Sequence, residues 1–285
     1  MTERRDFRND KNRLWRIVLI ALSFLFIVAM LVLPLAQVLH GALERGFPPF
    51  LKAVSDPYAV IALKLTLLIT AMTVVLNTFF GISAAWAITR FEFRGKGFLI
   101  TLIDLPFAVS PVIAGLVFIM TFGRLGWAYP FLQDWGIRIV FAIPGMVLAT
   151  IFVTFPFVGR ELIPVLTARG TDEEEAAILM GAGFFRTFWK VTFPHMRWAL
   201  LYGVILCTAR AMGEFGAVSV VSGHLRGKTN TLPLHIEILF KEYHTLQSFG
   251  AATILVCAAI LILIARNVVE SVSKKDDFHR ARQGV

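Results

Sequence analysis

Apolar stretches as long as a membrane span are the feature that most constrains this chain. A helix of about 20 apolar residues crosses the hydrocarbon core of a bilayer. Because hydrocarbon offers no partner for free backbone groups, each stretch must be helical. Of the 285 residues, 57% are hydrophobic and only 16% are charged, whereas a soluble domain is about 45–50% apolar. We therefore predict an all-α integral membrane protein.

Six stretches are long enough to be spans, and they are predicted at about 15–39, 60–88, 98–122, 139–158, 198–220 and 249–269. Residues 15–269 are expected to form one transmembrane domain, with cytoplasmic tails at 1–14 and 270–285. The first apolar run is too long for a typical signal peptide and is interpreted as an uncleaved helix. Pro106 and Pro111 lie inside the third stretch and predict a kink or break.

The distribution of basic residues predicts the orientation. Of the 28 Lys and Arg residues, 19 lie in the segment through Arg16, in the turn at 89–97, in the loop at 159–197 and in the segment from Arg266. Basic residues gather on the cytoplasmic side of membrane proteins. Both termini are therefore expected in the cytoplasm of a multi-pass protein, which suits six spans. Since the basic residues flank spans, nucleic-acid binding is not expected.

The loop at 159–197 carries the most informative pattern. Asp172, with Glu175 three residues later, has the spacing of a capping box that starts a helix. Gly181 or Gly183 suits the left-handed conformation that ends one. A second short helix is expected after this glycine elbow, at about 184–191. We predict that Pro194 stops this second helix before the fifth span, since proline cannot continue a helix.

This segment resembles the EAA loop of the permeases of ABC importers. That pattern is Glu-Ala-Ala, three residues, Gly, nine residues, then an aliphatic residue, any residue, an apolar residue and Pro. The chain matches every spacing, at Glu175, Ala176, Ala177, Gly181, Val191, Phe193 and Pro194. The resemblance implies a coupling helix that sits in a groove of a separate ATPase subunit. The alternative is that the aromatic face of the second helix lies on the membrane surface.

A narrower resemblance covers about residues 14–273. The segments 104–115 and 210–217 are similar to those of permeases for tetrahedral oxyanions, and 218–239 is most similar to the CysW-type sulfate/thiosulfate permeases. This resemblance implies a type I ABC-importer permease bundle. It further implies an ATPase dimer, a second homologous permease subunit and an extracytoplasmic sulfate/thiosulfate-binding protein as partners. No cofactor and no enzymatic activity of the chain itself are implied.

Arg210 and Glu214 are the ionisable pair inside the fifth predicted span. Four residues apart, they would share a helix face, and charges at membrane depth usually face a bundle interior or an aqueous cavity. Three roles are open: a structural ion pair, direct contact with an anion, and conformational switching. Ser110 and Ser219 are candidates for hydrogen bonds to a passing oxyanion, although serines in spans more often bond helix carbonyls.

Other functions are weighed against this one. A molybdate/tungstate permease shares the same motifs. An ion-coupled secondary transporter would show an internal repeat, and no clear repeat is seen. The segment 223–229 faintly resembles a phosphate-binding loop, but it has three residues between its glycines instead of four. ATP hydrolysis is therefore assigned to a partner subunit, and no metal-binding motif is found.

Overall fold

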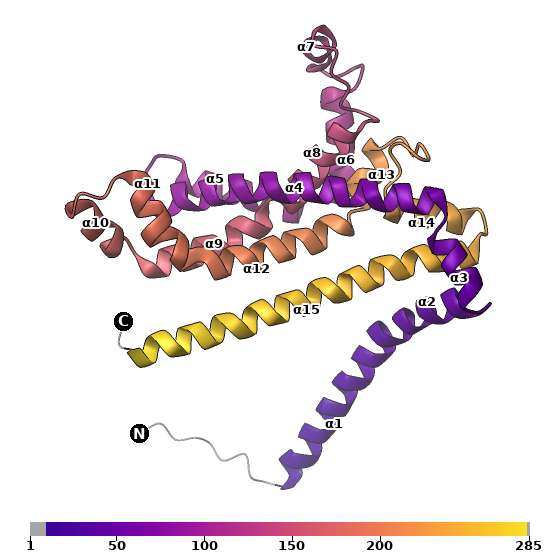
Figure 1. Ribbon diagram of the computed structural model, residues 1–285, viewed down its shortest axis with the longest axis horizontal. Coiled ribbons are helices and arrows are strands. Elements are labelled where there is room, and N and C mark those ends of the chain that lie inside the picture. The colour runs from indigo at the N-terminus through magenta and orange to yellow at the C-terminus, as the bar shows by residue number, and fades with distance from the viewer. Residues whose placement is uncertain (1–9, 284–285) are drawn as a thin grey trace.

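The computed structural model describes residues 10–283, so parts of both predicted tails, 1–9 and 284–285, lie outside the described residues. Every regular element of the described chain is a helix (Figure 1). The α-helices are α1 Asp10–Ile27, α2 Leu33–Leu43, α3 Phe47–Val54, α4 Pro57–Arg90, α5 Lys96–Ala108, α6 Pro111–Phe122, α7 Tyr129–Asp134, α8 Ile143–Thr154, α9 Pro156–Arg169, α10 Asp172–Leu179, α11 Phe184–Thr187, α12 Phe193–Met212, α13 Gly216–Val221, α14 Leu232–Lys241 and α15 Thr245–Gln283. Two π-helical segments, Val28–Val32 and Phe188–Thr192, join helices.

Four helical stretches are long and apolar enough to cross a membrane: Trp15–Leu43, Pro57–Arg90, Ile143–Arg169 and Thr245–Ser273. A fifth is reached if α5 and α6 form one broken span, since they pass the same test together and are bent by 109°. Six spans are predicted from the sequence, and the one that does not pass the test is the fifth, at 198–220, which corresponds to α12 and α13. Basic residues near both ends of α12, His195, Arg197 and Arg210, lower its hydropathy.

The break between α5 and α6 confirms the prediction made from the prolines, and it assigns the break to one of them. Pro106 lies inside α5 without ending it. The helix ends before Pro111, where Ser110 is extended with a ψ of 133°. A proline disfavours the α conformation of the residue before it, which explains why the chain turns here.

Helix α4 is the central element, and its start is fixed by local chemistry. The carboxylate of Asp56 accepts hydrogen bonds from the backbone N–H groups of Tyr58 at 3.0 Å and Ala59 at 3.2 Å. Pro57 follows at the first helical position, where its missing N–H costs nothing. The helix then packs against α8, α9 and α12.

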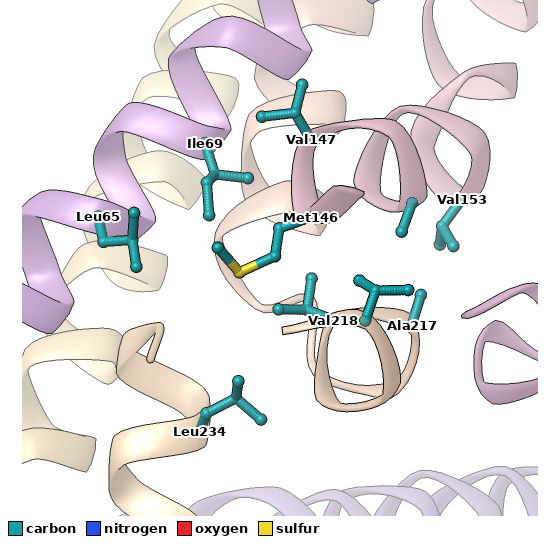
Figure 2. Close-up of a cluster of buried hydrophobic side chains, with 10 residues drawn as sticks. Leu65, Ile69, Met146, Val147, Val153, Ala217, Val218 and Leu234 are labelled. Carbon is teal, nitrogen blue, oxygen red and sulfur yellow. The ribbon is translucent and has the colours of Figure 1, made fainter. Parts of the chain in front are cut away.

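The core joins α4, α8, α13 and α14. Figure 2 shows that side chains from these four helices converge on Met146, which is fully buried. Leu65 and Ile69 come from α4, while Val218 comes from α13 and Leu234 from α14. Short helices therefore close one part of the bundle, although they cannot span a membrane themselves.

The two ends of the bundle are built differently. Helices α10 and α11 lie at one end, with the carboxyl end of α15, and α3 and α14 lie at the other (Figure 1). The predicted tail from residue 270 continues α15 as far as Gln283. Helix α1 diverges from α15, and none of the apolar window of its span is buried within the chain.

Candidate functional site

The elbow, which we define as residues 171–192, begins with α10. Thr171 is the N-cap residue and not Asp172, so that prediction is wrong by one position. Thr171 still pairs with the predicted residue, since its hydroxyl donates to Oε1 of Glu175 at 2.7 Å. Asp172 instead opens a first turn of four consecutive acidic residues, where the helix dipole favours negative charge.

Gly181, one of the two glycines predicted for this role, ends α10. Its φ is +84°, and the N–H groups of Gly181 and Ala182 donate to the carbonyls of Ile178 and Ala177 at 2.9 and 3.0 Å. These two bonds form a Schellman motif, which satisfies carbonyls at the end of the helix. Gly183 has a negative φ of −73° and serves as the N-cap of α11. The direction of the elbow is therefore set by one glycine.

The second helix of the elbow does not stop at Pro194, and that prediction is wrong. Helix α11, the π-helical segment Phe188–Thr192 and α12 run on without interruption, and Pro194 lies in the first turn of α12. A proline inside a helix loses one hydrogen bond and its ring clashes with the preceding turn. The wider π-helical turn just before it relieves this conflict. The same device precedes α2, where the segment Val28–Val32 comes just before Pro34.

A nearly buried ion pair fastens the elbow to the end of α4. Arg90 donates from Nε and Nη2 to the two carboxylate oxygens of Glu174, at 2.8 and 2.9 Å. Its Nη1 also donates to the carbonyl of Leu166 at 3.1 Å. The hydroxyl of Thr192 donates to Glu174 at 2.8 Å. The side chains of Arg90 and Glu174 are only 9% and 14% exposed, so water competes little with the pair.

Aromatic packing and a second polar contact support the same joint. The ring of Trp86 on α4 lies 4.8 Å from that of Phe184 and 5.4 Å from that of Phe188. Glu173 contacts Nε2 of His195 at 2.6 Å. The elbow is thus held to α4 and α12 by contacts that sequence reasoning missed. Their partners are far apart in sequence, and no local pattern predicts them.

The tip of the elbow is apolar and exposed. Leu179 and Met180 are 88% and 82% exposed, and Phe185 is 76% exposed. Ala176 and Glu175 are less buried than Ala177, which packs within the chain at 8% exposure. The three predicted coupling residues of α10 therefore lie on different sides of the helix. Ala177 packs inward, and Glu175 and Ala176 lie toward the outside.

The break between α5 and α6 lies beside a second break, between α12 and α13. A Cβ on Gly216 would lie 3.0 Å from Cβ of Pro111, and one on Gly115 would lie 2.8 Å from the carbonyl oxygen of Ala217. The prediction of one continuous helix at 198–220 is therefore wrong. Its small residues make a seam between α6 and α13 within the chain, as small residues do between membrane helices.

Substitution of Gly115 tests this seam. We expect Gly115→Ala to lower the free energy of unfolding by about 1–3 kcal/mol, because the added methyl overpacks a backbone contact. Gly97→Ala is the matched control, since a Cβ added there would meet no atom of the described residues within 4 Å. Thermal unfolding in detergent measures both. Equal midpoints for the Gly115 and Gly97 variants would contradict the close approach.

Arg210 and Glu214 form the predicted ion pair, but in a different geometry. Helix α12 ends at Met212, so Glu214 lies in the break and not on the same helix face. Nη1 of Arg210 is 2.5 Å from Oε2 of Glu214. The other carboxylate oxygen accepts from the N–H of Ala217 at 2.9 Å. Glu214, only 2% exposed, therefore joins the end of α12 to the start of α13.

The two candidate serines differ. The hydroxyl of Ser219 donates to the carbonyl of Gly216 at 2.8 Å, which is the ordinary role of a serine in a helix. Ser110 is exposed and is the N-cap residue of α6 at the bend. Asp104, on α5 before the bend, pairs with Nε of Arg160 at 2.8 Å and so fastens α5 to α9.

Comparisons with known proteins give the family. The model of the "binding-protein-dependent transport system inner membrane component" family matches residues 77–275. The sulfate transport system permease protein CysW of Synechococcus elongatus is 47% identical over 92% of each chain. CysW of Escherichia coli K12 is 48% identical over 88% of this chain and 87% of its own.

A solved structure matches as well. A chain of a bacterial ABC transporter involved in the import of the acidic polysaccharide alginate superposes with a TM-score of 0.75, at 16% identity, over 93% of this chain and 97% of that one. At this identity the likeness shows the fold alone, that of a type I importer permease. The chain therefore belongs to the inner membrane component family of binding-protein-dependent transport systems, and within it to the CysW-type permeases.

Proposed function

We propose that this chain is a transmembrane subunit of an ATP-driven importer of sulfate or thiosulfate. The observation that carries the proposal is the 47% identity to a sulfate transport permease over 92% of both chains. The chain supplies part of the path through the membrane. It is not an enzyme, and a separate ATPase provides the energy.

The elbow is proposed as the coupling site for that ATPase. Its exposed apolar tip, with Leu179 and Met180, has the character of a docking surface. Glu175 and Ala176 lie beside it on the outside of α10. Gly181 fixes the direction of the turn, and Pro194 lies in the first turn of α12. The Arg90–Glu174 pair stiffens the base. A stiff elbow converts a displacement of the ATPase into rotation of α4 and α12, whereas a flexible one would absorb it.

The remaining partners follow from the same family. They are a second homologous permease subunit, a second copy of the ATPase and an extracytoplasmic binding protein. One structural neighbour was solved in complex with a periplasmic protein bound to alginate pentasaccharide, which supports a docking protein on the side opposite the ATPase. We propose that the elbow and both termini are cytoplasmic, as the basic residues indicate.

Uptake in proteoliposomes tests the function. The chain, its sibling permease and the ATPase are reconstituted with ATP inside, and labelled sulfate is added outside with its binding protein. We expect uptake that requires ATP and that is inhibited by unlabelled thiosulfate. Stronger inhibition by molybdate or tungstate would instead favour the alternative substrate class. Uptake driven by an ion gradient without the ATPase would reject the proposal.

A further inference from the structure

A cavity of about 170 Å³ is lined by residues of α3, α4, α14 and α15 and of the loops beside them. Figure 1 shows α3 and α14 at the end of the bundle opposite the elbow. A single bound water needs only about 10–15 Å³ of such volume. The cavity is therefore large enough to receive a long side chain. Its polar lining comes from the start of α4, from α14 and the loop before it, and from the chain around the start of α15: Asp56, Tyr58, Arg226, His235, His244 and Gln247.

His235 is the most unusual member of this lining. It is only 3% exposed, and its Nε2 atom has no hydrogen-bond partner among the described residues. Burial lowers the pKa of His235, and the carboxylate of Asp56 offsets this in part. The ring is therefore neutral near pH 7 and can offer a lone pair. A buried polar atom without a partner costs free energy, and the ring that carries it belongs to the lining of the cavity.

The charge of the cavity points to a cation. Arg226 belongs to the lining, but it is paired with Glu242, which lies just outside it, so that their charges cancel. Asp56 remains, with a negative charge. Its Oδ2 atom accepts two N–H groups at the start of α4, and an ionised carboxylate has about four acceptor positions. A cationic donor would find its acceptor in Asp56, with Tyr58 and Gln247 also in the lining.

Two other ligand classes fit less well. An oxyanion would meet the carboxylate of Asp56, and like charges repel. A metal ion is not indicated, since no group of three or more His, Cys, Asp or Glu side chains in the described part of the chain is close enough to hold one. What remains is an organic cation that donates hydrogen bonds, such as an ammonium or a guanidinium group.

We propose that this cavity receives a Lys or Arg side chain of the extracytoplasmic protein that docks on the importer. The inference rests on the proposed function, because the side of the membrane on which the cavity lies follows from the proposed orientation. The side chain enters between α4 and α15 and pairs with Asp56. It thereby links docking to the two helices that run from this end of the bundle toward the elbow.

Two substitutions in the cavity test the inference. Asp56→Asn removes the charge but keeps the cap of α4, because Asn caps a helix as well as Asp does. Gln247→Lys places a competing cation in the cavity. Glu237→Gln is the control, since Glu237 lies on α14 outside the lining and pairs with Lys241 at 2.6 Å. The measurement is the Kd of the sulfate-loaded binding protein for the complete importer in nanodiscs.

We expect Asp56→Asn and Gln247→Lys each to raise the Kd at least about tenfold, as loss of a desolvated charge contact does, and Glu237→Gln to change it less than about twofold. Unchanged affinity in both cavity variants would overturn the inference. Equal weakening by all three would do so too, because it would reflect overall surface charge. If Asp56→Asn fails to assemble, Gln247→Lys decides alone. A wild-type importer that binds no docking protein would instead contradict the proposed function.

Discussion

Glu174→Ala is expected to reduce ATP-driven uptake by at least about tenfold while the assembled importer continues to hydrolyse ATP. The substitution removes both bonds to Arg90 and the bond to Thr192. It leaves the nearly buried guanidinium of Arg90 without its partner, which costs on the order of 3 kcal/mol at this joint. The elbow then moves without turning α4. Uptake and ATPase activity, measured on the same proteoliposomes, separate this uncoupling from misfolding.

Two further variants make this test specific. Glu92→Ala removes an acidic side chain that is 90% exposed and pairs with Lys96 within about one turn. Such surface pairs contribute about 0–1 kcal/mol, so uptake should stay near that of the wild type. Exchanging the charges, with Arg90→Glu and Glu174→Arg together, should restore part of the uptake. Normal coupling of ATP hydrolysis to uptake in Glu174→Ala would show that coupling does not require this joint.

Arg210→Ala is expected to have the second large effect, on assembly. It leaves the carboxylate of Glu214, which is 2% exposed, without its cation. Removing one partner of a buried ion pair costs about 3–5 kcal/mol. Because the side chain of Arg210 is 34% exposed, we expect the lower end of this range, which is still a large part of the stability of a typical protein. We expect little folded importer after purification, measured as the monodisperse fraction in size-exclusion chromatography.

A double substitution separates the three roles that the sequence leaves open for this pair. Arg210→Met with Glu214→Gln removes both charges, while the Gln side chain can still accept from Ala217. Folded importer should then return, because no uncompensated buried charge remains. Uptake that also returns would indicate a purely structural pair. Folded importer with no uptake would indicate contact with the anion or a part in switching. A double variant as poorly folded as Arg210→Ala would contradict the charge argument.

The elbow shows how far local sequence signals reach. A glycine end of α10, at Gly181 or Gly183, is predicted because only glycine readily takes the positive φ that such an end requires, and Gly181 takes it. The cap is misplaced by one residue, since Thr171 and Asp172 both favour that position. The Arg90–Glu174 pair could not be predicted, because its members lie 84 positions apart. Sequence reasoning finds the elbow but not what holds it.

The broken helices show which breaks a local sequence signal can predict and which it cannot. The bend before Pro111 is predicted, because a proline constrains its own neighbour. The end of α12 at Met212 is not, since an apolar run with small residues is compatible with a continuous span. The break becomes clear only from packing, where α13 lies against α6 with Ala217 close to Gly115. Pro194 misleads for a related reason, because the π-helical turn at Phe188–Thr192 accommodates it.

Crosslinking at the tip of the elbow tests the central claim most directly. Leu179 is 88% exposed and makes an acceptable site for a reactive cysteine, introduced as Leu179→Cys after the exposed Cys257 has been replaced by Ser. In the complete importer, with a cysteine placed in the proposed groove of the ATPase, we predict a disulfide-linked permease–ATPase product during ATP turnover. The product should be absent with Phe47→Cys, a 63% exposed position on α3 at the opposite end. A crosslink from Phe47→Cys and none from Leu179→Cys would contradict the account.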